Sequence, residues 1–196
     1  MEIYYLKKKK FLTSIDTASL EKFSNGRRYL SQDKYIEHLC GLFLTKFIAK
    51  HIYDIDNPQI ELCGGKPFFK NEKIFFSISH SNDVVLVAFN NRNIGVDVEY
   101  MCERNYKGIM KRYGKVSDNP ARTEFYKFWT VHEAEIKLNS EIKSLFSALL
   151  EKDYLFSCVS DDILVTDFCI KKLFLNGKNI DLVKEFEYPK YLYLKK

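Results

Sequence analysis

Three short apolar runs joined by four-residue polar turns constrain the fold more than any other feature of this 196-residue chain. The runs cover residues 74–79, 84–89 and 94–99, and the turns between them read His-Ser-Asn-Asp and Asn-Asn-Arg-Asn. Apolar runs of this length, separated by turns of this composition, are typical of antiparallel strands joined by hairpins. The sequence therefore predicts an antiparallel meander across residues 74–99.

Amphipathic helices are predicted on both sides of this meander. Apolar residues recur at spacings of three and four within residues 33–50, and the helix expected at 123–139 places aromatic and apolar side chains on one face. Further strands are expected at residues 3–6, 154–159, 163–168 and 191–194, and loops at 56–58 and 63–67. This order predicts an α+β fold of two similar lobes, residues 1–99 and 100–196, each an antiparallel sheet with a long packed helix.

The composition is that of a folded chain. Hydrophobic residues make up 46% and charged residues 29%, the net charge is +5, and the lysine run at residues 7–10 is interpreted as a solvated loop or strand end. The five cysteines are scattered singly, which indicates neither a disulfide framework nor a zinc site. No signal-peptide pattern opens the chain, and no apolar run approaches the roughly 20 residues that span a bilayer. We expect a cytoplasmic protein that does not cross a membrane.

Asp97 and Glu99 are the first candidates for chemistry. They lie two positions apart on a predicted strand, so both carboxylates project from one face, while Val96 and Val98 fill the other. Such a pair is often an ordinary solvated strand face, but hard oxygen ligands on a rigid strand also suit Mg²⁺. On the second helix, Glu133 is interpreted either as a partner in a surface ion pair or as a third metal ligand or general base.

The neighbouring polar residues carry weaker signals. His80 is interpreted as a turn residue or, beside a cation site, as a phosphate contact. Ser79 is not part of a G-x-S-x-G nucleophile motif. Lys66 follows two glycines in a loop that could approach a phosphate closely.

Four motifs, taken in order, resemble the Sfp-type 4'-phosphopantetheinyl transferases. They are Gly65-Lys66-Pro67, FSISHS at 76–81, IGVDVE at 94–99 and WTVHEAEIK at 129–137. The family patterns are GKP, F-N-x-S-H-S, G-x-D-x-E and W-x-x-K-E-A-x-x-K, so the match covers roughly residues 65–137. This chain departs from them at His132, where the family has Lys, at Ser77, where it has Asn, and in a loop after Lys137 that lacks the family's glycines.

The resemblance implies the 4'-phosphopantetheinyl transferase fold, with coenzyme A in the cleft between two lobes of a monomer. Mg²⁺, or alternatively Mn²⁺, would be held by Asp97, Glu99 and Glu133. Glu133, Lys137 and His80 would be catalytic, and coenzyme A would be contacted by Lys66, Pro67, Ser79, His80 and Lys137, with Arg28 and Lys46 as candidates for its 3'-phosphate. The activity implied is transfer of 4'-phosphopantetheine to a serine of an apo acyl carrier protein or carrier domain, with release of adenosine 3',5'-bisphosphate.

The sequence is compatible with two alternatives. The departures at His132 and in the loop are compatible with a weakened relative that binds coenzyme A without efficient transfer. A nucleic-acid-binding module would use the positive charge together with the 13 Tyr and 16 Phe residues, but no recognition helix or RNP-type strand is present. We therefore expect no nucleic-acid partner.

Overall fold

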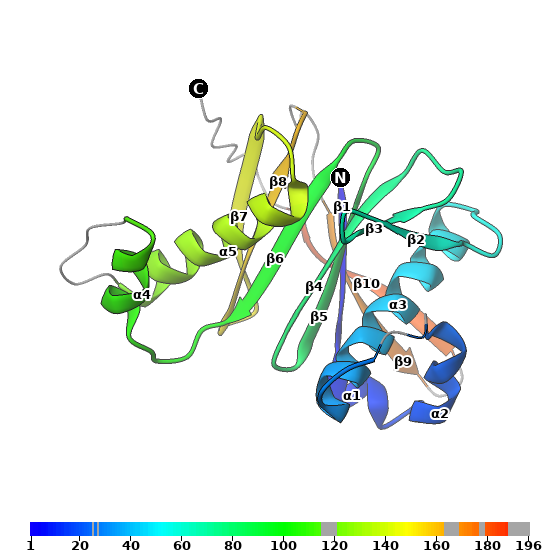
Figure 1. The fold of residues 1–196 in the computed structure, drawn as a ribbon. Coiled ribbons are helices and arrows are strands. Elements are labelled where there is room, and N and C mark those ends of the chain that lie inside the picture. The colour runs from blue at the N-terminus through cyan, green and yellow to red at the C-terminus, as the bar shows by residue number, and fades with distance from the viewer. Residues whose placement is uncertain (25, 27, 115–120, 163–168, 177–178, 188–196) are drawn as a thin grey trace.

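The computed structural model describes residues 1–24, 26, 28–114, 121–162, 169–176 and 179–187. Within them the larger sheet has the strand order β10-β9-β1-β5-β4 (Figure 1). Its strands are β1 (Glu2–Lys7), β4 (Phe75–Ser81), β5 (Val84–Asn90), β9 (Cys169–Asn176) and β10 (Asn179–Glu187). β1 pairs antiparallel with β5 and parallel with β9, so strands from both ends of the chain share this sheet.

A second sheet has the order β6-β8-β7, and a separate hairpin joins β2 to β3. These strands are β2 (Ile60–Cys63), β3 (Lys66–Phe69), β6 (Ile94–Tyr100), β7 (Ser144–Leu150) and β8 (Tyr154–Ser160). The helices are α1 (Lys8–Leu12), α2 (Thr17–Leu20), the 3₁₀ turn η1 (Glu21–Phe23), α3 (Gln32–Ile52), α4 (Tyr106–Arg112) and α5 (Arg122–Leu138).

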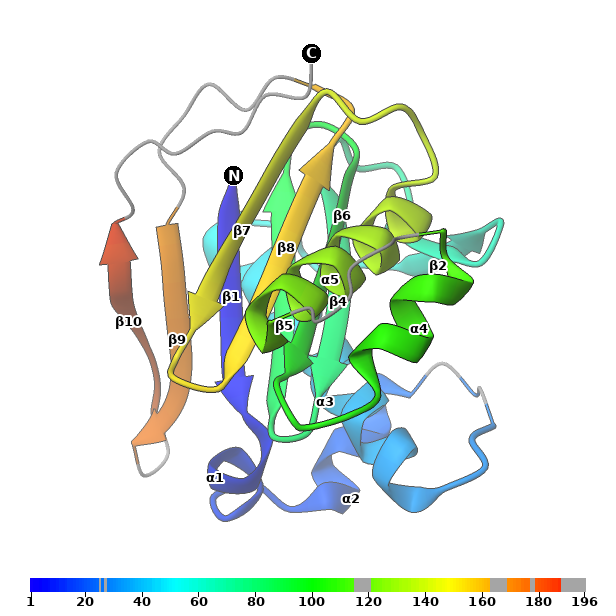
Figure 2. The same ribbon diagram turned by 90° about the vertical axis from the view of Figure 1, so that its left-hand side faces the viewer.

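The two sheets pack face to face, and the long helices cover their outer faces (Figures 1 and 2). Side chains of β1 alternate between two cores, with Ile3 and Tyr5 against the smaller sheet and Tyr4 and Leu6 against α3. All of β5 is buried for the same reason, which explains its unbroken apolar sequence VVLVAF. On β6, Val96 and Val98 face the core between the sheets, as the sequence predicts.

Glycine residues set the closest helix–strand approaches. A Cβ atom on Gly95 of β6 would lie 2.1 Å from the carbonyl oxygen of Ala134, so α5 crosses β6 backbone to backbone. On the other side of the molecule, a Cβ on Gly41 of α3 would meet the Ile78 side chain at 3.0 Å. The glycine of the G-x-D-x-E motif therefore brings α5 close above the strand that carries the carboxylates.

Most of the predicted elements are confirmed. The helices predicted at 33–50 and 123–139 correspond to α3 and α5, and the strands at 3–6 and 154–159 to β1 and β8. The predicted strands 163–168 and 191–194 lie outside the described residues. The loop expected at 63–67 is the turn of the β2–β3 hairpin together with the strand ends beside it.

One pairing is wrong. The predicted meander continues from β5 to β6, but β6 pairs with β8, because β1 and β4 occupy both edges of β5. The two sheets therefore draw strands from both halves of the chain. The five cysteines are free, and no helix in the described ranges is long and apolar enough to span a membrane.

Candidate active site

Asp97 is a buried carboxylate that faces α5. Its Oδ1 accepts hydrogen bonds from Ser79 Oγ and Lys137 Nζ, each at 2.7 Å, and Lys137 also donates to the Val96 carbonyl at 3.0 Å. Its Oδ2 atom is buried and has no hydrogen-bond partner. A buried carboxylate oxygen without a donor is costly unless a cation approaches it.

Glu99 lies two residues further along the same strand and is half-buried. Its Oε2 accepts a hydrogen bond from Ser81 Oγ at 2.7 Å. Burial raises the pKa of Glu99 and the charge of Asp97 raises it further, outweighing the opposing effects of Ser81 and Arg104. Neighbouring carboxylates with this imbalance favour a cation between them, which fits the predicted Mg²⁺ site.

Helix α5 presents one face to these carboxylates. Trp129 lies near enough to Glu99 for its indole N–H to lower the pKa of that carboxyl, and Lys137 binds Asp97. Glu133 lies one turn from each and therefore on the same side of the helix. Still, within the described part of the chain no three His, Cys, Asp or Glu side chains lie close enough together to form a metal centre. The role of Glu133 remains a prediction.

His80 lies on the opposite face of β4, toward α3. Its Nδ1 atom is 3.2 Å from Oε2 of Glu37, a buried carboxylate that also pairs with Lys8 at 3.0 Å and Lys34 at 2.8 Å. Burial lowers the pKa of His80, and the charges of Lys34 and Lys137 lower it further against the opposing effect of Glu37.

The sequence analysis missed Glu37 and Lys8. The available signal was a carboxylate within the apolar stripe of the predicted helix, next to Ile36 and close to Leu39. Lys8 belongs to the run interpreted as a solvated loop or strand end, but its side chain is largely buried against Glu37.

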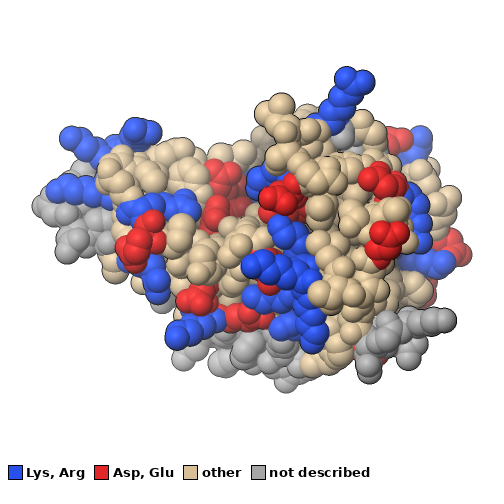
Figure 3. All heavy atoms as spheres, turned by 90° about the horizontal axis from the view of Figure 1, so that it is seen from below, with Lys and Arg blue, Asp and Glu red and all other residues tan. Residues whose placement is uncertain are grey.

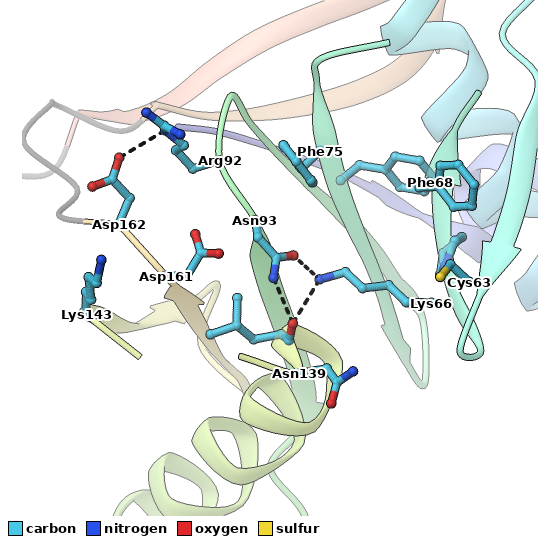
Figure 4. A pocket seen from close by; sticks show the side chains of 13 residues that line it. Cys63, Lys66, Phe68, Phe75, Arg92, Asn93, Asn139, Lys143, Asp161 and Asp162 are labelled. Atoms are coloured by element: carbon cyan, nitrogen blue, oxygen red, sulfur yellow. Dashed lines mark hydrogen bonds and ion pairs between the residues drawn. The ribbon is translucent and has the colours of Figure 1, made fainter. Parts of the chain in front are cut away.

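Lys66 joins three elements rather than pointing into open solvent (Figure 4). Its Nζ donates to Asn93 Oδ1, to the Ile94 carbonyl at 2.9 Å and, more weakly, to the Leu138 carbonyl at 3.4 Å. Burial lowers the pKa of Lys66 to about 8, with Asp161 opposing the shift. It therefore links β3 to the start of β6 and the end of α5, on the wall of a cavity of about 780 Å³.

Two smaller cavities connect the predicted site residues. One of about 560 Å³ extends from the Gly64–Pro67 turn to Lys137, and one of about 290 Å³ includes Tyr29 and His80. Both are lined by Pro67 and Ile78. The two cavities thus adjoin at the hairpin turn, and between them they are lined by Lys66, Pro67, His80 and Lys137, but not by Asp97, Glu99 or Ser79.

Three candidate residues lie elsewhere. Arg28 lines a separate cavity of about 390 Å³, and Lys46, on α3, is not among the residues lining these cavities. His132 packs against aromatic rings, with its ring centre 4.7 Å from that of Tyr113 and 6.2 Å from that of Phe128. The imidazole of His132 therefore packs against aromatic rings at the position where the family pattern has a lysine.

The Sfp-type resemblance predicts an α+β protein in which two strand carboxylates face a helix lysine beside a Gly-Lys-Pro turn. The chain is 30% identical to 4'-phosphopantetheinyl transferase gsp of Aneurinibacillus migulanus, over 65% of this chain and 57% of the relative. It is 26% identical to 4'-phosphopantetheinyl transferase Sfp of Bacillus subtilis, over 69% of this chain and 67% of the relative. It is 32% identical to a provisionally named 4'-phosphopantetheinyl transferase of Haemophilus influenzae, over 37% of this chain and 36% of the relative.

No protein-family model matches the chain, and it covers little more than a third of the Haemophilus relative and 57% of the Aneurinibacillus one. The alignments nevertheless confirm the resemblance found from the motifs. The chain is similar in sequence to the Sfp-type 4'-phosphopantetheinyl transferases.

Proposed function

We propose that this protein transfers 4'-phosphopantetheine from coenzyme A to a serine of an apo acyl carrier protein or carrier domain, in a Mg²⁺-dependent reaction. The observation that carries the proposal is the pair Asp97 and Glu99, with one buried oxygen lacking a partner, beside Lys137 and the cavity at Pro67. The names of the curated relatives support the same class of reaction.

In this proposal Asp97, Glu99 and Glu133 hold the cation, which when bound neutralises the pyrophosphate and the leaving adenosine 3',5'-bisphosphate. Lys137 exchanges part of its contact with Asp97 for a phosphate oxygen, and His80 binds a second phosphate. The carboxylate of Glu133 accepts the proton of the carrier serine. The serine Oγ bonds to the β-phosphorus of coenzyme A as the bond from that phosphorus to the leaving adenosine 3',5'-bisphosphate breaks.

Coenzyme A is proposed to lie across the two smaller cavities, of which the larger lies between residues of the predicted lobes 1–99 and 100–196 and the smaller is lined by residues of 1–99 alone. Pro67 and Ser79 would contact the nucleotide, and Lys66 would hold the hairpin turn against α5. The 3'-phosphate would be bound by Arg28 or Lys46 only if the ligand extends beyond these cavities, since neither residue lines them.

The expected partner is acidic. The chain carries a net charge of +5, and Figure 3 shows Lys and Arg side chains gathered in the middle of one face, at the end of the molecule where Figure 1 places α1. A basic surface of this kind speeds encounter with a negatively charged carrier protein. We expect the enzyme to act on it as a cytoplasmic monomer.

Intact-mass measurement of an apo acyl carrier protein tests the proposal. Incubation with this protein, coenzyme A and Mg²⁺ should add roughly 340 Da, the mass of one phosphopantetheine arm. EDTA should abolish the gain. No gain with any of several carrier proteins, while coenzyme A still binds, would favour the second candidate.

That second candidate is a weakened relative that binds coenzyme A without efficient transfer. The position of His132 among aromatic rings favours it, because the family's lysine at that place is lost. Retention of Asp97, Glu99 and Glu133 together argues for the transferase.

A further inference from the structure

Strands β4 and β6 run side by side but belong to different sheets in the described structure (Figures 1 and 2). Side-chain hydroxyls of β4 take the place of a backbone ladder between them. Three backbone N–H groups of β6 donate to serine oxygens of β4: Val96 to Ser77 at 3.0 Å, Val98 to Ser79 at 3.1 Å and Tyr100 to Ser81 at 3.0 Å. Each serine accepts from the residue 19 positions later, so the two strands are parallel and in constant register.

Two of these hydroxyls have a second role. Ser79 Oγ donates to Asp97 Oδ1 and Ser81 Oγ donates to Glu99 Oε2, each at 2.7 Å. A hydroxyl has one proton to donate, so accepting from the backbone while donating to a carboxylate fixes its rotation. Each carboxylate then has one oxygen held by β4, and at Asp97 the other oxygen is left without a hydrogen-bond partner.

Ser77 repeats the first contact without the second. The residue 18 positions after it is Gly95, which has no side chain to receive the hydroxyl proton. Ser77 therefore supports β6 in the same way as its two neighbours but holds no carboxylate. The chain thus contains its own control for separating a structural role from a role in the cation site.

We propose that Ser79 and Ser81 are positioning residues that orient the carboxylates of Asp97 and Glu99 toward a divalent cation. Each serine holds one carboxylate oxygen, and for Asp97 the other oxygen is the buried Oδ2 without a partner. Hydrogen bonds behind metal ligands set their orientation and basicity. The inference rests on the proposed function only in taking the ligand to be a divalent cation.

Mn²⁺ binding to the full chain, measured by electron paramagnetic resonance of the free ion with and without coenzyme A, tests this. Ser81→Ala and Ser79→Ala should each raise the dissociation constant for Mn²⁺ by roughly tenfold to a hundredfold. Because Ser77 also lines the 560 Å³ cavity proposed for coenzyme A, its control value is the one measured without coenzyme A. There Ser77→Ala should leave the dissociation constant within about twofold while lowering the melting temperature by roughly 2–4 °C, as the loss of one hydrogen bond predicts. Ser81→Thr keeps the hydroxyl and should bind Mn²⁺ like the unmodified chain.

The results distinguish failure of the proposed positioning role from failure of the proposed transferase activity. If the chain modifies a carrier protein but all three alanine variants bind Mn²⁺ alike, the positioning role is overturned and the transferase stands. If Mn²⁺ binding follows the expected pattern but no carrier is modified, the positioning role stands and the transferase falls. A chain that binds no Mn²⁺ even with coenzyme A, or a Ser81→Thr variant as weak as Ser81→Ala, overturns the positioning role.

Discussion

On the α3 side of the molecule the buried carboxylate of Glu37 is surrounded by Lys8, Lys34 and His80, whereas on the α5 side only Asp97 of the two β6 carboxylates pairs with a lysine, Lys137. Burial raises the pKa of Glu37, but the two lysines and the histidine outweigh it, so that the pKa lies below its usual range. The pKa of Glu99 lies above it. At the first site two lysines outnumber the one carboxylate, whereas at the second two carboxylates lie beside one close lysine.

This difference shows how a structural acid can be told from a ligand-binding one. Both sites are enclosed by a helix and a strand, and both carry carboxylates away from bulk water. The two sites differ in the net charge of the carboxylates together with the ionised side chains around them. At Glu37 the carboxylate already has its cations, although Nδ1 of His80 is buried without a hydrogen-bond partner, while at Asp97 and Glu99 a cation would offset the excess negative charge.

The largest effect is expected at the unbalanced site. Asp97→Asn should lower the rate of carrier modification by about a thousandfold or more, because a neutral amide is a poor ligand for a divalent cation. The fold should survive, since the substitution is isosteric. Intact-mass kinetics give the rate and circular dichroism gives the fold; near-normal transfer would remove Asp97 from the site.

Replacing the glycine at each close helix–strand contact should change the stability of the protein by different amounts. Gly95→Ala places a methyl group against the backbone of α5 and should cost about 3 kcal/mol or more of unfolding free energy. Gly41→Ala meets only the movable Ile78 side chain and gains helix propensity, so its net effect should stay within about 1 kcal/mol. Urea unfolding measures both, and equal losses would contradict the close crossing of α5 over β6.

Neutralising one carboxylate at each site should change stability in opposite directions. At neutral pH and without metal, Glu37→Gln should lower the unfolding free energy by about 2 kcal/mol, because it leaves the largely buried Lys8 without its anion. Glu99→Gln should raise it, because it removes a charge that burial and Asp97 disfavour. Denaturant titration in EDTA compares the two, and the same sign for both would contradict the contrast between the sites.

The pH dependence of the Glu37 effect follows from its lowered pKa. A carboxylate with a depressed folded-state pKa contributes fully above its unfolded pKa and loses that contribution as pH falls through the folded value. The difference between Glu37→Gln and the unmodified chain should thus be full at about pH 7 and shrink in acid. Unfolding midpoints measured across this range test it, and a difference independent of pH would exclude the ion pairs as its cause.

The smallest effect is expected at His132. Because its ring packs against Tyr113 and Phe128 at the outer side of α5, His132→Lys should change the transfer rate by less than about threefold. Steady-state kinetics check this. A loss of tenfold or more would show that the imidazole has a role of its own.

Much of the secondary structure, and part of the candidate site, could be predicted from the sequence. Local periodicity predicted α3, α5 and most strands of residues 74–100, and motif order predicted Asp97, Glu99 and Lys137. The pairing of β6 with β8 could not be predicted, because any exposed edge can accept an apolar strand. Lys8 and Glu37 are 29 residues apart, so only the tertiary fold brings them together.

Carrier modification by the unmodified chain, Glu99→Gln and Glu37→Gln, followed side by side by intact mass with Mg²⁺, tests the central claim most directly. The account predicts a gain of roughly 340 Da with the unmodified chain, none with Glu99→Gln, and a rate within about tenfold of normal with folded Glu37→Gln. Transfer that survives in Glu99→Gln but is lost in folded Glu37→Gln would place the chemistry on the α3 side and contradict it.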